Sequence, residues 1–311
     1  MTLAVIDIGT NTTLLLVASI DSTGRMTPLV YEQRIPRLGR GVDASRQLHP
    51  ESMERTIGVL REYRTILDTH TPQAIVVCGT SALRDARNSE AFASGVRRAT
   101  GFSLEILSGE DEALWTFRGA LSGLRDSSSA TVVDIGGGST EVIWGEQRTV
   151  LGQESVDIGA VRLTERFFKH DPPSSEEVRR ARAWVQGELS VKLRDTPPLR
   201  PLVGVAGTAT SLALLDQGVS TFSLGSVVDH RISRHRVEHL MEKLLALPHK
   251  QILSLAGALE GREDVMAGGT LILHELMRIL GADELLVSER GVRYGLALRE
   301  WERLVSRDVR L

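Results

Sequence analysis

The sequence has one cysteine, Cys78, among 311 residues, so it can form no internal disulfide. It contains no apolar run near the roughly 20 residues of a membrane span, and no basic and apolar leader precedes Asp7. The net charge of −3 gives no general attraction to nucleic acid or acidic membranes, so a polyanion would need a local basic surface. We therefore expect a cytoplasmic protein without nucleic-acid or membrane partners, in which Cys78 is a packing residue.

Several common catalytic signatures are also missing. The chain has no Gly-x-Ser-x-Gly elbow, no Gly-x-x-x-x-Gly-Lys-Ser/Thr loop and no dinucleotide-binding fingerprint. Its 8 histidines show no metal-binding spacing. Any phosphate or metal chemistry must therefore come from other residues.

The sequence does contain a duplicated pattern. Residues Val5–Thr13 and Val132–Thr140 each consist of an apolar β-branched run, an aspartate, a glycine and small hydroxyl residues. A second pair, Val76–Ala82 and Val203–Thr210, follows in the same order at nearly the same separation. One glycine loop is weak evidence, but four in a matched arrangement indicate two halves of related topology.

Strands and helices alternate along the whole chain, which predicts an α/β protein, and its length suits two domains. A polar stretch, Asp126–Ser129, marks their junction. Residues 50–68, 89–99, 110–121, 264–280 and 291–305 have the composition or apolar spacing of helices, and Ser174 with Glu177 forms a capping box before a helix that runs to about residue 194. The main predicted strands are 3–8, 14–20, 74–78, 130–135, 141–144, 149–156, 202–206 and 284–288.

Asp7 and Asp134 each end a buried strand just before a loop of exposed backbone N–H groups. Glu141 starts the outgoing strand and could return to the same cavity as Asp134. Carboxylates in this setting suit Mg²⁺, which prefers oxygen ligands and bridges phosphate oxygens. The alternative is that each acid only caps a turn; for the pair of loops together we favour the metal and phosphate interpretation.

The loop residues themselves are candidate phosphate ligands. Their glycines permit positive φ and close backbone approach to an anion, and their hydroxyls can donate hydrogen bonds. Glycine and hydroxyl clusters also form ordinary hairpin turns, an alternative that is weakest for Asp134–Thr140. The candidates are Gly9, Thr10, Asn11, Thr12, Thr80, Gly136, Gly137, Gly138, Ser139, Thr140, Gly207 and Thr208.

Three consecutive acids, Glu110 to Glu112, open a predicted helix. Ser108 with Asp111 resembles a capping pair, and acids are favourable at a helix N-terminus, so a structural role is the stronger interpretation on physics alone. Three acids nevertheless exceed what a cap needs, and one of them could deprotonate a water molecule that attacks phosphorus. Arg37 and Arg84, in two further loops, have the fork geometry that suits phosphates.

Taken together, these motifs resemble the exopolyphosphatase / guanosine pentaphosphate phosphohydrolase (Ppx/GppA) family of the actin-like ATPase superfamily. The combination of Ser108–Ala113 with Asp134–Glu141 is the specific part, and the resemblance covers essentially the whole chain. It implies two ribonuclease H-like domains with an active-site cleft between them. The implied boundaries are 1–122, with the last helix 293–311 packing back on it, and 123–292.

The resemblance also implies roles. Glu112 falls on the family's catalytic glutamate, Asp134 and Glu141 on its magnesium ligands, and Arg84 on an arginine of its substrate channel. The phosphate loop is Gly136–Ser139, and Asp7 is expected near the metal. Mg²⁺ is the implied cofactor, K⁺ is left open as an activator, and a homodimer is expected.

Some positions depart from the family pattern. Leu14 stands where many relatives carry a basic residue, Glu289 replaces a common aspartate, and Tyr294 replaces a common glutamate. Longer relatives carry an additional helical half of the HD type, which we expect this chain to lack.

We expect an exopolyphosphatase that releases orthophosphate from the end of inorganic polyphosphate. The first alternative is the same chemistry on the guanosine pentaphosphate pppGpp. A kinase or nucleotide-driven switch, and a non-catalytic polyphosphate or alarmone sensor, are the remaining alternatives.

Overall fold

The computed structural model describes residues 1–124, 129–147, 149–197, 200–255 and 259–308. The chain divides into two compact units. Unit 1 comprises Met1–Ser122 together with Val292–Leu311, and unit 2 comprises Gly123–Gly291. Most of the predicted junction, residues 126–128, and the last residues of the predicted C-terminal helix, 309–311, lie outside the described residues.

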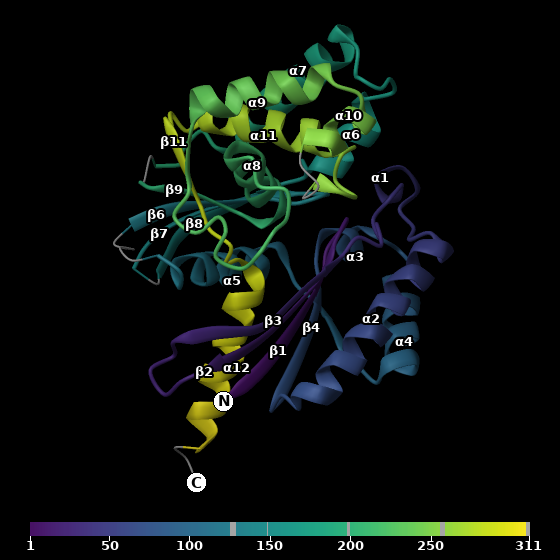
Figure 1. Cartoon of the computed structure of the whole chain (residues 1–311), viewed down its shortest axis with the longest axis vertical. Helices are drawn as coiled ribbons and strands as arrows, with labels where there is room; N and C mark the ends of the chain where they lie inside the picture. Colours follow the sequence, from purple (N-terminus) through teal and green to yellow (C-terminus); the bar gives the residue numbers. More distant parts are fainter. Residues whose placement is uncertain (125–128, 148, 198–199, 256–258, 309–311) are drawn as a thin grey trace. The chain divides into compact units, whose positions relative to one another are not determined.

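Unit 1 is built on a five-stranded mixed sheet of order β3-β2-β1-β4-β5 (Figure 1). Strand β2 pairs antiparallel with β1 and with β3, whereas β1, β4 and β5 are mutually parallel. The strands are β1 (Thr2–Ile8), β2 (Thr13–Ile20), β3 (Met26–Arg34), β4 (Ala74–Gly79) and β5 (Leu104–Ile106).

Alternation along β1 supplies a core on each face of this sheet. Ala4 and Ile6 belong to the apolar cluster that includes residues of α2 (Pro50–His70) and α4 (Ser89–Thr100), which lie side by side in Figure 1. Leu3 and Val5 point to the other face, where they pack with residues of α12 (Val292–Asp308). The remaining helices of this unit are α1 (Val42–Ser45), α3 (Ser81–Asp85) and α5 (Gly109–Leu121), of which α5 packs beside α12.

Unit 2 repeats this arrangement. Its sheet has the order β10-β11-β9-β6-β7-β8, in which β6, β7 and β8 form an antiparallel meander and β9 and β11 run parallel to β6. Among the strands that the structure describes, the antiparallel edge strand β10 is the one without a counterpart in unit 1. The strands are β6 (Ser129–Ile135), β7 (Thr140–Glu146), β8 (Thr149–Val156), β9 (Leu202–Val205), β10 (Arg231–Ser233) and β11 (Glu284–Val287). Two α/β domains of related, ribonuclease H-like topology are therefore confirmed.

The helices of unit 2 enclose its main apolar core. The predicted capping box is confirmed, because the Ser174 side chain accepts from the Glu177 N–H and the Glu177 carboxylate accepts from the Ser174 N–H. The helices are α6 (Ala160–Phe167), α7 (Ser175–Lys192), α8 (Ala206–Gln217), α9 (Arg234–Ala246), α10 (His249–Leu255) and α11 (Met266–Ile279). Among the described residues, none of the helices has both the length and the apolar character needed to cross a membrane.

Candidate functional site

The two acids predicted to bind metal in unit 2 lie directly opposite one another. Asp134 on β6 pairs in register with Glu141 on β7. Residues that face each other across an antiparallel pair have their Cβ atoms about 5 Å apart and their side chains on one face. Both acids are buried, and the Ser155 hydroxyl donates a hydrogen bond to Glu141 Oε1 over 3.0 Å. The hairpin therefore presents two adjacent carboxylates at its closed end.

The first copy of the hairpin presents only one carboxylate. Asp7 pairs in register with Leu14 on β2, at the position that Glu141 occupies in the second copy. On its other side Asp7 pairs with Cys78, whose Sγ lies 4.0 Å from Asp7 Oδ1. The two copies share a fold but carry different chemistry, and the acid pair belongs to unit 2.

The glycine loop of unit 2 is held by the start of α6. The carbonyl of Gly136 accepts from the N–H of Ala160, and the carbonyl of Gly137 accepts from the N–H groups of Val161 and Arg162. The Arg162 Nε–H donates to the Gly138 carbonyl over 2.7 Å. In the described part of the chain, the N–H groups of Gly137 and Gly138 have no backbone acceptor. With its carbonyls occupied, the loop has these donors available for an anion.

Gly159 makes this contact possible. A Cβ atom at Gly159 would lie 2.3 Å from the carbonyl carbon of Gly137 and 2.4 Å from the nitrogen of Gly138. A side chain at this position would therefore push α6 away from the loop. Neither Gly159 nor the buried Arg162 was predicted as part of the site.

The loop of unit 1 closes in the same way as its counterpart. The Gly9 N–H donates to the Thr12 carbonyl over 2.9 Å, as the Gly136 N–H does to the Ser139 carbonyl over 3.0 Å. The Asn11 carbonyl accepts from the N–H of Arg37, while the buried Asn11 Nδ2 has no hydrogen-bond partner within the described ranges of the chain. Asn11 Nδ2 is therefore an unsatisfied donor in the first loop, as expected of a residue that binds an anion.

One part of the predicted reason for the loop glycines, positive φ, was wrong for three of them. Gly9, Gly136 and Gly207 do not adopt positive φ. Gly207, at the start of α8, is required instead by space, because a Cβ there would lie 1.6 Å from Nη1 of Arg262. The arginine therefore rests against the N-terminus of α8, where its charge would add to that of the helix dipole.

Two of the hydroxyls predicted to bind phosphate are used within the fold. Thr208 Oγ1 donates to the Ile135 carbonyl over 3.0 Å, and Thr140 Oγ1 donates to the Ile158 carbonyl over 2.6 Å. These hydrogen bonds link α8 and the segment around Ile158 to the β6–β7 hairpin. The two hydroxyl hydrogens are therefore already donated within the fold. The other predicted hydroxyl donors, Thr10, Thr12, Thr80 and Ser139, are also buried.

The three acids at the start of α5 divide between two roles. Ser108 caps the helix, since its Oγ accepts from the Asp111 N–H at 3.0 Å and donates to the Asp111 carboxylate at 2.9 Å. Glu110 is exposed. Glu112 is buried and forms an ion pair with Arg84, whose Nη1 lies 2.5 Å from Glu112 Oε2. Neither Glu110 nor Glu112 takes part in this cap, and of the two Glu112 is the one buried inside unit 1.

Burial perturbs the acids of unit 1. Desolvation raises the pKa of Glu112 above the ordinary carboxyl value, and the neighbouring Arg84 opposes that rise. Desolvation likewise raises the pKa of Asp7 to about 7, with Arg293 opposing the rise and Glu112 adding to it. Carboxyl groups with raised pKa values are typical of catalytic acids and bases.

Arg293 completes this group and was missed from the sequence. It lies at the start of α12, is buried, and stacks 4.5 Å above the ring of Tyr31. Its Nη1 has no hydrogen-bond partner among the described atoms. A buried arginine acting on an acid 286 positions earlier leaves no local sequence signal, although it falls within the predicted C-terminal motif Ser288–Gly295.

Comparison with known proteins decides the family. A family model described as the Ppx/GppA phosphatase family matches residues 16–304. The chain belongs to the Ppx/GppA phosphatase family. Exopolyphosphatase 2 of Mycobacterium tuberculosis is 37% identical over 310 residues, which cover 95% of this chain and 97% of that protein.

Further relatives include a solved Ppx/GppA structure and a protein named for the guanosine nucleotide activity. The solved structure of the Aquifex aeolicus Ppx/GppA family member is 31% identical, with a TM-score of 0.82 over 97% of this chain and 98% of that one. A guanosine-5'-triphosphate,3'-diphosphate pyrophosphatase of Vibrio vulnificus is 28% identical over 99% of this chain and 61% of that protein. The predicted family is confirmed.

The acid pair of this Ppx/GppA protein suits a magnesium ion. No group of three or more histidine, cysteine, aspartate or glutamate residues that could hold a metal occurs among the described residues. Mg²⁺ does not require such a cage, since it is usually held by one or two carboxylates, water and phosphate oxygens. Asp134 and Glu141, side by side and without histidine or thiolate neighbours in the sheet register, match that donor set.

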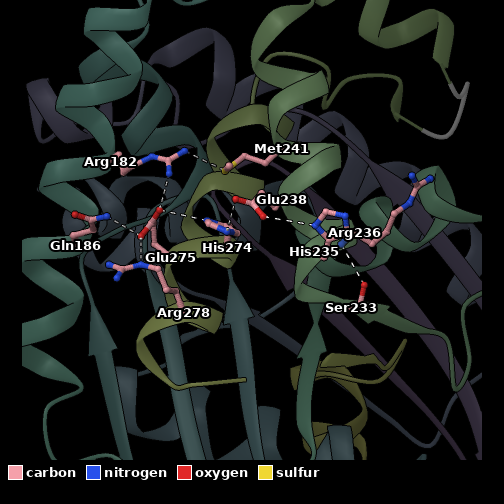
Figure 2. A network of polar contacts seen from close by, with 10 residues as sticks. All are labelled: Arg182, Gln186, Ser233, His235, Arg236, Glu238, Met241, His274, Glu275 and Arg278. Carbon is pink, nitrogen blue, oxygen red and sulfur yellow. Dashed lines mark hydrogen bonds and ion pairs between the residues drawn. The ribbon is translucent and has the colours of Figure 1, made fainter. Parts of the chain in front are cut away.

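A second polar cluster in unit 2 is structural. In Figure 2, dashed lines join Glu275 of α11 to four neighbouring side chains. Glu275 is fully buried. Its carboxylate accepts from Gln186 at 2.9 Å and Arg278 at 3.0 Å, and lies 3.3 Å from both Arg182 and His274. These partners come from α7 and α11. They occupy the hydrogen-bonding positions of the Glu275 carboxylate oxygens, so this side chain is not placed to bind a substrate.

Replacing Glu275 with glutamine should destabilise the protein. Although burial opposes ionisation, the hydrogen bonds from His274, Gln186 and Arg278 lower the pKa of Glu275 to about 2. Such a shift stabilises the fold by roughly 3 kcal/mol at neutral pH, and this contribution is lost as pH falls from the ordinary carboxyl range toward 2. Chemical denaturation measures the free energy of unfolding of wild type and Glu275→Gln. The difference between these two free energies should be smaller at acidic pH than at neutral pH. The exposed Glu242→Gln on α9 is the control.

Proposed function

We propose that this protein is a Mg²⁺-dependent exopolyphosphatase that hydrolyses the terminal phosphoanhydride of inorganic polyphosphate. Its family membership and the 37% identity to an exopolyphosphatase support this proposal. The observation that carries it is Glu112: a buried acid of raised pKa, paired with an arginine and not needed by the helix cap. A structural acid would be expected to take part in the cap, as Asp111 does.

Glu112 is the general base. As the oxygen of a water molecule attacks the terminal phosphorus, Glu112 accepts one proton from that water. The anhydride bond breaks, and the shortened polyphosphate leaves with the bridging oxygen as an anion. Arg84 fixes the carboxylate by its contact at 2.5 Å and favours the ionised form that can accept a proton.

The glycine loops supply hydrogen-bond donors for the phosphoryl oxygens. In unit 2 these are the N–H groups of Gly137 and Gly138, whose carbonyls are held by α6. In unit 1 the unsatisfied Nδ2 of Asn11 is the corresponding donor. Phosphoryl transfer depends mainly on positioning and on stabilising charge, which fixed donors provide without rearranging during the reaction.

Asp134 and Glu141 would hold the magnesium ion. When bound, Mg²⁺ would neutralise negative charge on the end of the substrate. Ser155 fixes the Glu141 carboxylate through its hydrogen bond of 3.0 Å, so that the pair is oriented in advance. The proposal also includes Asp7 as a ligand of this ion.

The second candidate function is hydrolysis of the 5'-phosphate of pppGpp. The likeness to a guanosine-5'-triphosphate,3'-diphosphate pyrophosphatase favours it, because this relative matches 99% of the chain. The same base, loops and metal would perform the same chemistry on either substrate, so the distinction lies in what binds beyond the terminal phosphates.

A phosphate-release panel tests these functions. Purified protein is given long polyphosphate, tripolyphosphate, pppGpp and ATP with and without Mg²⁺. The proposal expects Mg²⁺-dependent release with the highest kcat/KM on long polyphosphate. Highest kcat/KM on pppGpp would favour the second candidate, and binding without release would indicate a sensor.

Replacing Arg84 with glutamine should move the pH profile. Arg84 lowers the pKa of Glu112, so its removal raises that pKa further. Because the ionised base is the active form, the acidic limb of kcat/KM should shift to higher pH. The exposed Arg97→Gln serves as the control. An unchanged acidic limb would mean that Glu112 is not the titrating base.

We also propose a cytoplasmic location, and a homodimer on the family resemblance alone. Sedimentation analysis of the purified protein tests the dimer. Phosphate release with and without K⁺ tests whether this ion is an activator.

A further inference from the structure

Helix α6 contacts all three glycine carbonyls of the loop Gly136–Ser139 in unit 2. The carbonyls of Gly136 and Gly137 accept from backbone N–H groups in the first turn of α6, over 2.9 to 3.0 Å. The carbonyl of Gly138 accepts over 2.7 Å from the side chain of Arg162, through its Nε–H. Two of the carbonyls are therefore held by neutral backbone groups, and one is held by a guanidinium.

These contacts fix the direction in which the N–H groups of the loop point. The peptide bonds within Gly136–Ser139 are trans. In a planar trans peptide, the carbonyl and the N–H point in opposite directions. Because the three glycine carbonyls face α6, the N–H groups of Gly137, Gly138 and Ser139 face the opposite side of the loop.

The same three N–H groups are available to an anion. In the ranges of the chain that the structure describes, none of them has a backbone acceptor. Successive N–H groups on one side of a turn form a concave site that suits an anion. The loop thus presents three donors on one side while its glycine carbonyls are occupied on the other.

Arg162 acts on one of these donors more than on the others. The Gly138 carbonyl and the Ser139 N–H belong to the same peptide group, so a hydrogen bond to the carbonyl polarises the N–H and strengthens it as a donor. A hydrogen bond from a charged group is roughly twice as strong as one from a neutral group. Arg162 is only 4% exposed, so solvent screens its charge weakly. The Ser139 N–H is therefore the donor of the loop that a full positive charge supports.

The beginning of α6 holds Arg162 in place. The next residue, Leu163, is fully buried in the main core of unit 2, and its N–H donates to the Gly159 carbonyl over 2.8 Å. One turn later on the same helix, Arg166 is exposed, and its guanidinium lies 5.0 Å from the ring centroid of Trp184. Helix α6 therefore offers a second arginine, in a different environment, for comparison with Arg162.

We propose that Arg162 is a positioning residue of the phosphate site. It holds the Gly138–Ser139 peptide with its N–H toward a phosphoryl group, and its charge strengthens that N–H as a donor to a phosphoryl oxygen. This inference rests on the proposed function and adds a residue that acts on the substrate through the loop. The ligand class is a terminal phosphoryl group or free orthophosphate, because the three donors contact phosphoryl oxygens only. Arg162 should therefore affect polyphosphate and pppGpp alike.

Two substitutions separate the charge of Arg162 from its hydrogen bond. Arg162→Gln keeps a neutral N–H donor, whereas Arg162→Lys keeps the positive charge. Arg162→Gln should lower kcat on long polyphosphate about tenfold, which is less than the loss expected when a donor is removed outright. Arg162→Lys should recover most of that loss. The KM should change little in either variant, since the loop holds one phosphoryl group of many.

Arg166→Gln is the matched control, because it makes the same chemical change on the same helix. It should retain the kcat of wild type. If Arg162 only clamps the loop mechanically, the neutral donor of glutamine serves as well as the charge of lysine. Equal kcat values in Arg162→Gln and Arg162→Lys would therefore overturn the proposal while leaving the proposed hydrolysis intact.

Binding of inorganic orthophosphate separates this proposal from the proposed function. In calorimetric titrations, the dissociation constant of orthophosphate should be about tenfold higher for Arg162→Gln than for wild type or Arg166→Gln. That result would support the role of Arg162 even if wild type releases no phosphate from polyphosphate. Equal dissociation constants in wild type and Arg162→Gln, or no binding by wild type, would overturn it.

A measurement on wild type keeps the test decisive if Arg162→Gln does not fold. Amide NMR spectra are recorded while orthophosphate is added to the intact protein. The largest changes in chemical shift should occur at Gly137, Gly138 and Ser139. A Ser139 amide that does not respond to orthophosphate would overturn the proposal.

Discussion

Replacing Glu112 with glutamine should lower kcat for phosphate release from polyphosphate by about 10²–10⁴-fold, the usual contribution of a general base. Glutamine has nearly the same size and can still contact Arg84, but it cannot accept the proton of the attacking water. Because Glu112 has no part in the helix cap, the fold should be retained. Phosphate release and thermal unfolding together measure the effect.

The neighbouring acid provides a matched control for Glu112. Glu110 lies in the same first turn of α5 and is exposed. Glu110→Gln makes the same chemical change at the same helix end and should retain wild-type turnover. Near wild-type turnover in Glu112→Gln would reject the assigned base, and an equal loss in both variants would point to a general charge effect.

Replacing Asp134 with asparagine should abolish most Mg²⁺-dependent turnover, with a loss of about 10²-fold or more if the metal stabilises the transition state. The variant keeps the size of the side chain and its place opposite Glu141, but weakens the ligand. Binding of Mn²⁺ in place of Mg²⁺, followed by electron paramagnetic resonance, gives a readout independent of activity. Weaker ion binding should accompany the lost turnover.

Glu146 provides the control for the metal site. It lies at the far end of β7, is exposed, and pairs in register with Ser129. Glu146→Gln should change neither ion binding nor turnover. If Asp134→Asn keeps its activity but loses its dependence on Mg²⁺, the metal assignment is wrong.

The duplicated hairpins could be predicted from sequence because their signal is local. An apolar run, an acid and a glycine within nine residues define each strand and its turn, and the register then places Asp134 opposite Glu141. The capping box at Ser174 is similarly local and is confirmed. The sequence could not show which of the three acids of α5 has a role other than capping. That role depends on which acid forms the ion pair with Arg84 in the folded protein.

Helix α8 was missed for a different reason. Its residues from Ser211 to Leu215 are all buried, so the helix lacks the polar face that produces a 3.6-residue pattern. Gly159, Arg162 and Arg293 were missed because their importance comes from contacts with distant segments. Gly159 allows close contact with the backbone of Gly137, which lies 22 residues earlier. In the sequence, such a glycine looks the same as an ordinary turn glycine.

The departures from the family pattern now have partial explanations. The longer Glu289 carboxylate accepts from the N–H of Gly225 at 2.8 Å and that of Val227 at 3.1 Å, so it supports a loop of unit 2. Tyr294 belongs to α12 and is buried in the core of unit 1. In the β1–β2 hairpin, Leu14 lies opposite Asp7, at the position that Glu141 takes opposite Asp134 in the β6–β7 hairpin. This is why the first hairpin carries one acid and the second carries two.

The central claim is that polyphosphate hydrolysis depends both on the proposed base Glu112 and on the proposed metal ligand Asp134. The most direct measurement is polyphosphate turnover by Glu112→Gln, Asp134→Asn and the double variant. Residues that act as a unit have strongly non-additive effects on turnover, so the double variant should be little slower than the slower single variant. If the two losses multiply in full, the residues act independently and the account is contradicted.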